Sequence, residues 1–231
     1  MPRAAGYNPH VGAARGYFFT LEGIEGCGKS TAARYLQSLL EVRGRPTFLT
    51  REPGGTALGE MLRAIILSPQ LSGDALSPVE QVFLFCASRA RLAREVVRPL
   101  LESGRDVICD RYLDSTFAYQ GVGGSISDEQ LNALNRIATQ GVVPDLTLLL
   151  DLPVEAGLSR RRIGGDINWI DKREIEFHSE VRDRFLRLAA AEPGRIKIVD
   201  SSGDQETTRA GIRSILDEFF AINQAGGSAR T

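Results

Sequence analysis

The feature that most constrains this chain is a glycine-rich segment, Gly23-Ile24-Glu25-Gly26-Cys27-Gly28-Lys29-Ser30. It matches the pattern G-x-x-x-x-G-K-[ST] at every position, and it lies between an apolar segment, 17–22, and an amphipathic one, 30–42. Glycines let the backbone curl so that several N–H groups face a phosphate, and the following helix presents its positive end to the same anion. A chance glycine-rich turn rarely meets all these conditions. The segment therefore predicts a nucleoside triphosphate site, and we assign contacts with ATP to residues 23–31, Thr31 included.

Two side chains of this loop carry chemistry. Lys29 is expected to reach the β and γ phosphates, and the Ser30 hydroxyl can ligate Mg²⁺. Asp110 ends an apolar run, 106–110, so its carboxylate is a second candidate for the metal, and Arg111 beside it can clamp a phosphoryl group in fork geometry. A plain surface ion pair is the alternative for Asp110 and Arg111. Arg51 follows another apolar run, 47–50, so it is expected at the same edge of the sheet and is a candidate for a second anion site. One site for a triphosphate and one for a monophosphate favour a nucleotide kinase.

The remaining pattern predicts the fold. Apolar runs at 17–22, 47–50, 106–110, 146–150 and 195–199 are continuous rather than alternating, and helical segments separate them. Strands buried on both faces with helical crossovers indicate a three-layer α/β P-loop kinase fold, with a five-stranded parallel sheet and a lid segment. The longest helix is predicted over 77–102, opened by a capping box of Ser77 and Glu80, with a kink or an early end at Pro99.

Composition bounds the function. The 231 residues are 42% apolar, and 28 basic residues stand against 29 acidic ones, for a net charge of −1. This balance disfavours a general nucleic-acid or membrane-surface binder, and no apolar run approaches the ~18 residues that span a bilayer. Three scattered cysteines favour a reducing compartment, and we expect a cytoplasmic protein. We expect a flexible extension over 1–16, one kinase domain over 17–222 with its lid at about 160–171, and a flexible tail over 223–231.

Several blocks together resemble the bacterial type of thymidylate kinase, a P-loop nucleoside monophosphate kinase. They are 18–31, 50–56, Phe85 with Arg89, 110–121, and 143–147 with 150–151, and the resemblance runs from about residue 17 to 220. It implies phosphorylation of dTMP to dTDP by ATP–Mg²⁺ in dTTP biosynthesis. It also implies a homodimer, formed through the helix of residues 77–101, and no nucleic-acid or membrane partner.

The resemblance also implies an acceptor pocket. Phe85 corresponds to a ring that stacks on thymine and Arg89 to the side chain that reads it, although spacing alone favours a core phenylalanine beside a solvated arginine. Tyr119 corresponds to a ring packed where a ribose 2′-hydroxyl would lie; ordinary helix packing is its alternative. The implied substrate-binding set is Glu22, Arg51, Phe85, Arg89, Arg111, Ser115, Thr116, Tyr119 and Gln120, and the implied metal-binding set is Ser30, Asp110 and Glu22.

The lid departs from the family pattern. Because the phosphate loop carries Glu25 rather than a basic residue, the resemblance implies that the lid supplies a cationic side chain to the transferring phosphate. Gly164 and Trp169 stand where bacterial lids often carry arginine, so the sequence leaves open which arginine acts. For Trp169 we favour core packing over stacking on adenine, and for His178 a structural role. The expected catalytic set is Lys29, Asp110, Arg111, Arg160, Arg161 and Arg162.

Two other functions remain open from the sequence alone. One is a different nucleoside monophosphate or deoxynucleoside kinase, which a different acceptor preference would reveal. The other is a catalytically impaired ATP-binding module, which the altered lid motivates. The presence of Lys29, Asp110 and Arg111 argues against the second.

Overall fold

A computed structural model describes residues 15–68, 76–164 and 170–227. Its sheet contains β1 (Phe18–Glu22), β2 (Thr47–Arg51), β3 (Asp106–Asp110), β4 (Leu146–Asp151) and β5 (Ile196–Asp200). The strand order is β2-β3-β1-β4-β5, and every neighbouring pair is parallel. Each strand predicted from the sequence is confirmed to within one residue at either end.

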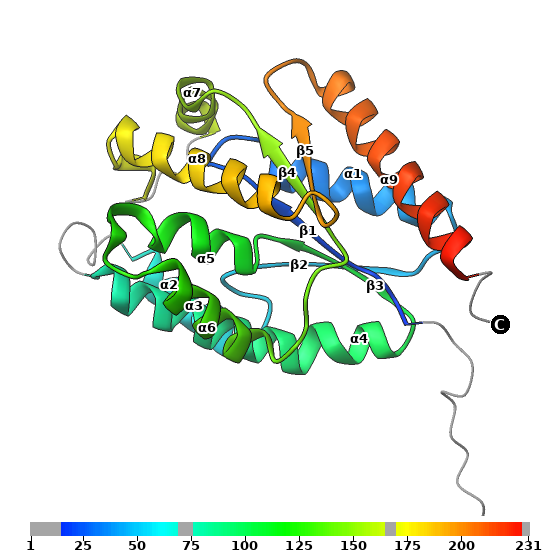
Figure 1. Cartoon of the computed structure of the whole chain (residues 1–231), viewed down its shortest axis with the longest axis horizontal. Coiled ribbons are helices and arrows are strands. Elements are labelled where there is room, and N and C mark those ends of the chain that lie inside the picture. Colours follow the sequence, from blue (N-terminus) through cyan, green and yellow to red (C-terminus); the bar gives the residue numbers. More distant parts are fainter. Residues whose placement is uncertain (1–14, 69–75, 165–169, 228–231) are drawn as a thin grey trace, which may run out of the picture.

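Helices cover both faces of this sheet (Figure 1). The α-helices are α1 (Lys29–Val42), α2 (Ala57–Ile66), α3 (Pro78–Leu92), α4 (Arg98–Glu102), α5 (Leu113–Gln120), α6 (Asp128–Thr139), α7 (Val154–Gly164), α8 (Ile175–Ala191) and α9 (Gln205–Gly227). Short turns are η2 (Ala93–Val97), η3 (Val122–Gly124) and η4 (Ile170–Lys172). Helices α1 and α9 pack together on one face, whereas α4, α5 and α8 cover the other. The predicted three-layer architecture is confirmed.

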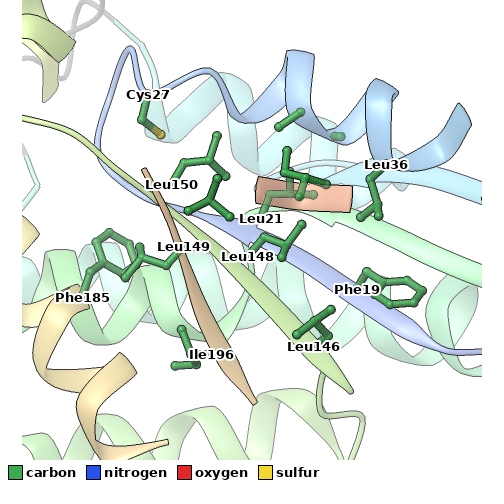
Figure 2. Packing of buried hydrophobic residues seen from close by; sticks show 14 of the residues in the cluster. Phe19, Leu21, Cys27, Leu36, Leu146, Leu148, Leu149, Leu150, Phe185 and Ile196 are labelled. Atoms are coloured by element: carbon green, nitrogen blue, oxygen red, sulfur yellow. The ribbon is translucent and has the colours of Figure 1, made fainter. Parts of the chain in front are cut away.

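The strands read as continuous apolar runs because both faces are buried. On β1, Phe19 and Leu21 point into a cluster that includes Leu36 of α1 (Figure 2). Phe18 points to the opposite face of the sheet, where it joins a separate cluster with Leu92 and Val97. Successive side chains of a strand face opposite ways, so a strand between two helical layers is mostly apolar on both faces. Thr20 of β1 is a buried polar exception, and its hydroxyl forms a hydrogen bond with that of Thr147 on β4.

The long helix begins as predicted and is interrupted earlier than predicted. The Ser77 side chain accepts from the Glu80 N–H, and the Glu80 carboxylate accepts from the Ser77 N–H at 2.6 Å, which completes the capping box. The break is a π-helical turn, Ala93–Val97, in which the Arg98 N–H donates to the Ala93 carbonyl. Pro99 would clash with the carbonyl of Glu95 in a regular helix, and the wider turn relieves that clash before the proline is reached.

The sheet brings the polar strand ends to one edge. Arg51 and Leu21 both pair with Asp110, and Glu22 pairs with Leu149. The predicted lid is partly helical, because α7 extends to Gly164 and η4 follows at Ile170. Trp169 lies outside the described residues. Within the described ranges, no helix is both long and apolar enough to cross a membrane.

Candidate active site

The phosphate loop joins β1 to α1 in the conformation that its glycines permit. Gly26 has φ +73°, and a Cβ there would lie 1.9 Å from the carbonyl oxygen of Gly157 in α7. Gly28 is the N-cap of α1 and has a left-handed backbone, φ 92°. Only glycine meets both demands easily, since L-residues rarely adopt positive φ and the loop packs tightly on α7. The free N–H groups at the start of α1 therefore face the loop, as an anion site requires.

The two chemistry-bearing side chains of the loop lie together at the start of α1. Lys29 is nearly buried, and its Nζ donates to the carbonyls of Gly23 and Ile24 at 3.0 and 2.7 Å. The Ser30 hydroxyl, in the first turn of α1, donates to Oδ2 of Asp110 at the end of β3, at 2.7 Å. The candidate metal ligands Ser30 and Asp110 are thus brought together.

Two cavities meet at the phosphate loop. The larger has a volume of about 460 Å³ and the smaller about 320 Å³. Both are lined by Gly26, Gly28, Thr31 and Arg160. The larger continues over the carboxyl ends of β2 and β3 to Phe85 of α3, whereas the smaller continues over α1 to the segment that enters α9. A phosphate held by the loop is therefore accessible from two sides.

Arg111 is the centre of the larger cavity's polar network. Its Nη1 donates to the Gly23 carbonyl and to Ser115 Oγ, both at 3.1 Å, and its Nη2 donates to Glu25 and to Tyr119 Oη, also at 3.1 Å. Its backbone is left-handed, with φ 71°. A non-glycine residue in this region costs roughly 1–2 kcal/mol, a strain that is common at binding sites. The network holds the guanidinium in one place on the cavity wall.

Glu25 anchors this network from the phosphate loop. Its Oε1 accepts from Tyr119 Oη at 2.7 Å, and its Oε2 lies 3.4 Å from Nδ1 of the buried His178. Burial alone would raise the pKa of the Glu25 carboxyl, but His178 and the charges of Arg111 and Lys29 outweigh it and lower the pKa to about 2. Glu25 is therefore an anion at neutral pH. His178 contacts it from α8 and is not among the described residues that line the cavity, in keeping with the structural role expected.

Glu22 lies behind the cavity wall. It is fully buried, and its carboxylate accepts from the Tyr112 N–H at 2.7 Å, the Ser115 N–H at 3.2 Å and the Ser115 hydroxyl at 2.6 Å. Burial and the nearby charge of Asp114 raise the pKa of the Glu22 carboxyl to about 7. The side chain fixes the start of α5 and, within the described residues, does not face the cavity with Ser30 and Asp110. Its predicted contact with a metal therefore needs a change of these contacts.

Arg89 also lies behind the wall rather than on it. Its side chain is 1% exposed. Its Nε and Nη2 contact Glu52 Oε2 at 2.9 and 2.8 Å, and its other bonds go to Thr116 Oγ1, Asn135 Oδ1 and the Tyr112 carbonyl. The guanidinium thus donates four hydrogen bonds, and Nη2 also lies in ion-pair contact with Glu52. A direct bond from Arg89 to a base carbonyl requires one of them to be exchanged.

The wall itself contains most of the predicted acceptor residues. Phe85 of α3 lines the larger cavity, and so do the following polar residues predicted from the sequence: Arg51, Arg111, Ser115, Thr116, Tyr119 and Gln120. Arg51 is largely exposed and donates to Glu60 at 3.1 Å. An aromatic ring and a cationic group thus share one cavity, as a nucleoside monophosphate requires.

The three lid arginines take different positions. Arg160 lines both cavities and donates to the backbone carbonyls of residues 201–203 at 2.8–3.4 Å. Arg161 lines the larger cavity and donates to Asp171 at 3.0 Å. Arg162 is exposed and is absent from the described lining of either cavity. The structure therefore separates candidates that the sequence left equal.

Three polar residues of the described lining were not assigned from the sequence. Arg63 of α2 donates to the Pro53 carbonyl at 3.0 Å, and burial together with the charge of Arg51 lowers the pKa of its guanidinium. Glu52 is buried beside the cavity, and burial raises the pKa of its carboxyl to about 7 against the charge of Arg89. Gln81 lines the cavity one helical turn before Phe85. The i, i+4 spacing of Gln81 from Phe85 was the sequence signal that could have placed Gln81 in the cavity. Arg63 could not be placed, because helix α2 was not predicted from the sequence.

A parallel sheet in this order, with a phosphate loop between two cavities and a lid of arginines, defines a P-loop nucleotide kinase. Residues 21–212 match the family model for thymidylate kinase. The thymidylate kinase of Desulfovibrio desulfuricans is 46% identical over 210 residues, which cover 88% of this chain and 96% of that protein. That of Citrifermentans bemidjiense is 44% identical over 221 residues, covering 93% and 97%. The crystal structure of thymidylate kinase from Ehrlichia chaffeensis superimposes with a TM-score of 0.71 at 30% identity, covering 88% of this chain and 99% of that one. The chain belongs to the thymidylate kinase family.

Proposed function

We propose that this protein transfers the γ-phosphoryl group of ATP to dTMP, forming dTDP and ADP, a step of dTTP synthesis. The observation that carries the proposal is the pair of cavities that meet at the phosphate loop, with Phe85 and two strand-end arginines in the larger one. ATP would occupy the smaller cavity with its base and the loop with its phosphates, and dTMP the larger. Family membership supports thymine as the base.

The proposed reaction is a direct in-line transfer that depends on positioning and charge neutralisation. Lys29 binds the β and γ phosphates, while Arg51 and Arg111 bind the phosphate of dTMP from the opposite side. A lid arginine neutralises the charge that develops on the transferred group. The anchoring of Arg111 by Glu25 and Tyr119 limits its motion, so that the acceptor oxygen stays aligned with the γ phosphorus. No covalent intermediate with the protein is needed.

The metal proposed is Mg²⁺, held by Ser30 and Asp110. Their hydroxyl and carboxylate oxygens are hard donors 2.7 Å apart at the foot of the phosphate loop, which fits this ion. The described residues contain no group of three or more His, Cys, Asp or Glu that could hold a metal. Mg²⁺ commonly binds through one or two protein oxygens together with phosphates and water, so two ligands suffice. When bound, the ion would neutralise phosphate charge.

A panel of acceptors tests the function. ADP formation would be measured with ATP and Mg²⁺ against dTMP, dUMP, UMP, dCMP, dGMP, AMP and thymidine. A strong preference for dTMP is expected. Turnover on another acceptor would keep the kinase class and overturn thymine as the base, and binding of ATP without turnover on any acceptor would support an impaired module instead.

Removal of the Phe85 ring is expected to raise the KM for dTMP roughly tenfold, since stacking on an aromatic side chain contributes about 1–3 kcal/mol per base. The KM for ATP should stay unchanged, because Phe85 lines only the larger cavity. Steady-state kinetics of Phe85→Ala would measure this, with Phe85→Tyr as the variant that keeps a ring. Unchanged dTMP kinetics in the alanine variant would exclude Phe85 as the stacking residue.

We also propose a homodimer formed by α2, α3 and α6, which pack side by side (Figure 1). Large apolar side chains protrude from these helices: Met61 is 66% exposed, Phe83 58% and Ile137 73%. Leu58, Met61 and Ile65 follow helical spacing on α2, as Val79 and Phe83 do on α3. A surface of this kind is costly in water, and a second copy would cover it.

The proposed location is the cytoplasm, where ATP is available and where free thiols such as Cys27, Cys86 and Cys109 are usual.

A charge at the centre of this surface should separate the subunits. Phe83→Glu is expected to shift the protein from dimer to monomer at micromolar concentration, because two carboxylates would be buried near each other across the two-fold axis. Light scattering after size-exclusion chromatography measures the mass. Ile222→Glu on α9, where the side chain is 62% exposed, is the matched control and should stay dimeric. A dimeric Phe83→Glu variant would place the interface elsewhere.

A further inference from the structure

We propose that Gln81 is a positioning residue that fixes the direction of the Gln120 carboxamide and thereby makes the acceptor pocket select a base with an N–H donor. This inference rests on the proposed function, since it concerns how the same pocket distinguishes thymine from cytosine. Gln81 lies in the first turn of α3 and Gln120 at the end of α5, and both line the larger cavity.

The two amides form a chain that begins at a backbone carbonyl. Gln81 Nε2 donates to the carbonyl oxygen of Leu76 at 2.9 Å, and Gln81 Oε1 accepts from Gln120 Nε2 at 3.3 Å. The capping box of Ser77 and Glu80 holds the first turn of α3, so the Leu76 carbonyl is a firm anchor. Gln120 is 5% exposed, and its Oε1 makes no hydrogen bond with any described residue.

The direction of this chain is set at its anchored end. A carbonyl oxygen can only accept, so Gln81 must turn its NH₂ group toward Leu76 and its oxygen toward Gln120. Gln120 must then present its NH₂ group to Gln81, because the opposite orientation would bring two acceptor oxygens together. The Gln120 oxygen is left facing the cavity. The Gln120 carboxamide, whose two orientations would otherwise be nearly equal in energy, therefore adopts only one of them.

A second group on the wall has its direction set in the same way. Thr116 Oγ1 accepts from Arg89 Nη1 at 2.9 Å, and the guanidinium can only donate. The Thr116 hydroxyl hydrogen is therefore directed away from Arg89 and is available as a donor. The wall next to Phe85 thus offers one acceptor, from Gln120, and one donor, from Thr116.

This pattern complements one class of base. Thymine and uracil carry an N–H donor at N3 beside a carbonyl acceptor at C4, whereas cytosine has an acceptor at N3 beside an amino donor. Cytosine would place acceptor against acceptor and donor against donor, and a buried polar group without a partner costs about 1–3 kcal/mol. The residue that the base touches is Gln120, while Gln81 acts only through it.

The test compares kcat/KM for dTMP and dCMP in two variants of Gln81. Gln81→Met keeps the length of the side chain but removes both hydrogen bonds, so Gln120 can rotate; the dTMP/dCMP ratio is expected to fall about tenfold, the equivalent of one lost buried hydrogen bond. Gln81→Glu keeps an acceptor for Gln120 Nε2, so its ratio should stay within about threefold of the wild type. The KM for ATP should be unchanged in both variants, and thermal melting checks that both fold.

A double-mutant cycle separates positioning from direct contact. In a Gln120→Met background, Gln81→Met should leave the dTMP/dCMP ratio unchanged, since its only route to the base is gone. A further fall there would mean that Gln81 touches the base itself and would overturn the proposal. An unchanged ratio for Gln81→Met alone, or an equal fall for Gln81→Met and Gln81→Glu, would overturn it as well. A wild-type enzyme without preference for dTMP would instead refute the proposed function, so the two failures are distinguishable.

Discussion

Substitution of Lys29 by alanine is expected to lower kcat by roughly 10²–10³-fold or more, the scale on which removal of one preorganised charge-stabilising donor acts. Lys29 is nearly buried in the wall of the larger cavity, and its ammonium donates to the carbonyls of Gly23 and Ile24. It is therefore fixed within reach of the transferred phosphoryl group without further ordering. Single-turnover measurements with ATP and dTMP would give the chemical step directly.

The control for this experiment is Lys197→Ala on β5, which lies in neither described cavity lining and should leave kcat unchanged. ATP affinity of both variants by calorimetry separates binding from chemistry. If Lys29→Ala binds ATP normally and turns over within tenfold of the wild type, the phosphate loop does not perform the role assigned to it.

Removal of a lid arginine is the second large effect expected. Arg160 is the lid arginine that lines both cavities, so it lies where the proposed donor and acceptor phosphates would meet. We expect Arg160→Ala to lower kcat by on the order of 10³, the scale of an arginine that stabilises phosphoryl-transfer charge. Arg161→Ala should have a smaller effect, because Arg161 lines only the acceptor side and is paired with Asp171.

Arg162→Ala provides the matched control from the same helix, since its side chain is exposed and outside the described cavity linings. Its kcat should stay within about twofold of the wild type, as for most surface substitutions. A set in which none of the three variants loses tenfold in kcat would refute a lid arginine as the charge-neutralising group. A loss of kcat confined to Arg162→Ala would contradict the order of effects expected from the cavity linings.

Much of the fold follows from the sequence because the constraints are local. Continuous apolar runs fix the strands, and the phosphate loop fixes the junction of β1 with α1. The π-helical turn at Ala93–Val97 could not be located in advance, since Pro99 signals that a helix is disturbed but not how the chain relieves the clash.

The sequence motifs predicted most of the polar residues that line the larger cavity, but not the directions in which the side chains point. The motifs assign Glu22 and Arg89 to substrate binding, whereas neither side chain is among the described residues that line the larger cavity. Their directions depend on partners distant in the chain, Ser115 for Glu22 and Asn135 for Arg89. No spacing rule reveals such pairings, because they arise only when α5 lies beside β1 and α6 packs against α3. The relation of Gln81 to Gln120 is of the same kind.

The left-handed backbone of Arg111 has a consequence for engineering. Backbone geometry alone would favour glycine there, because glycine adopts φ 71° without strain. Such a redesign would discard the guanidinium that joins the phosphate loop to α5 through Glu25 and Tyr119. It would also deprive the buried Glu25 carboxylate of one of its charged partners, a loss that exceeds the strain glycine would relieve. A variant designed for stability should therefore keep arginine at this position despite its backbone strain.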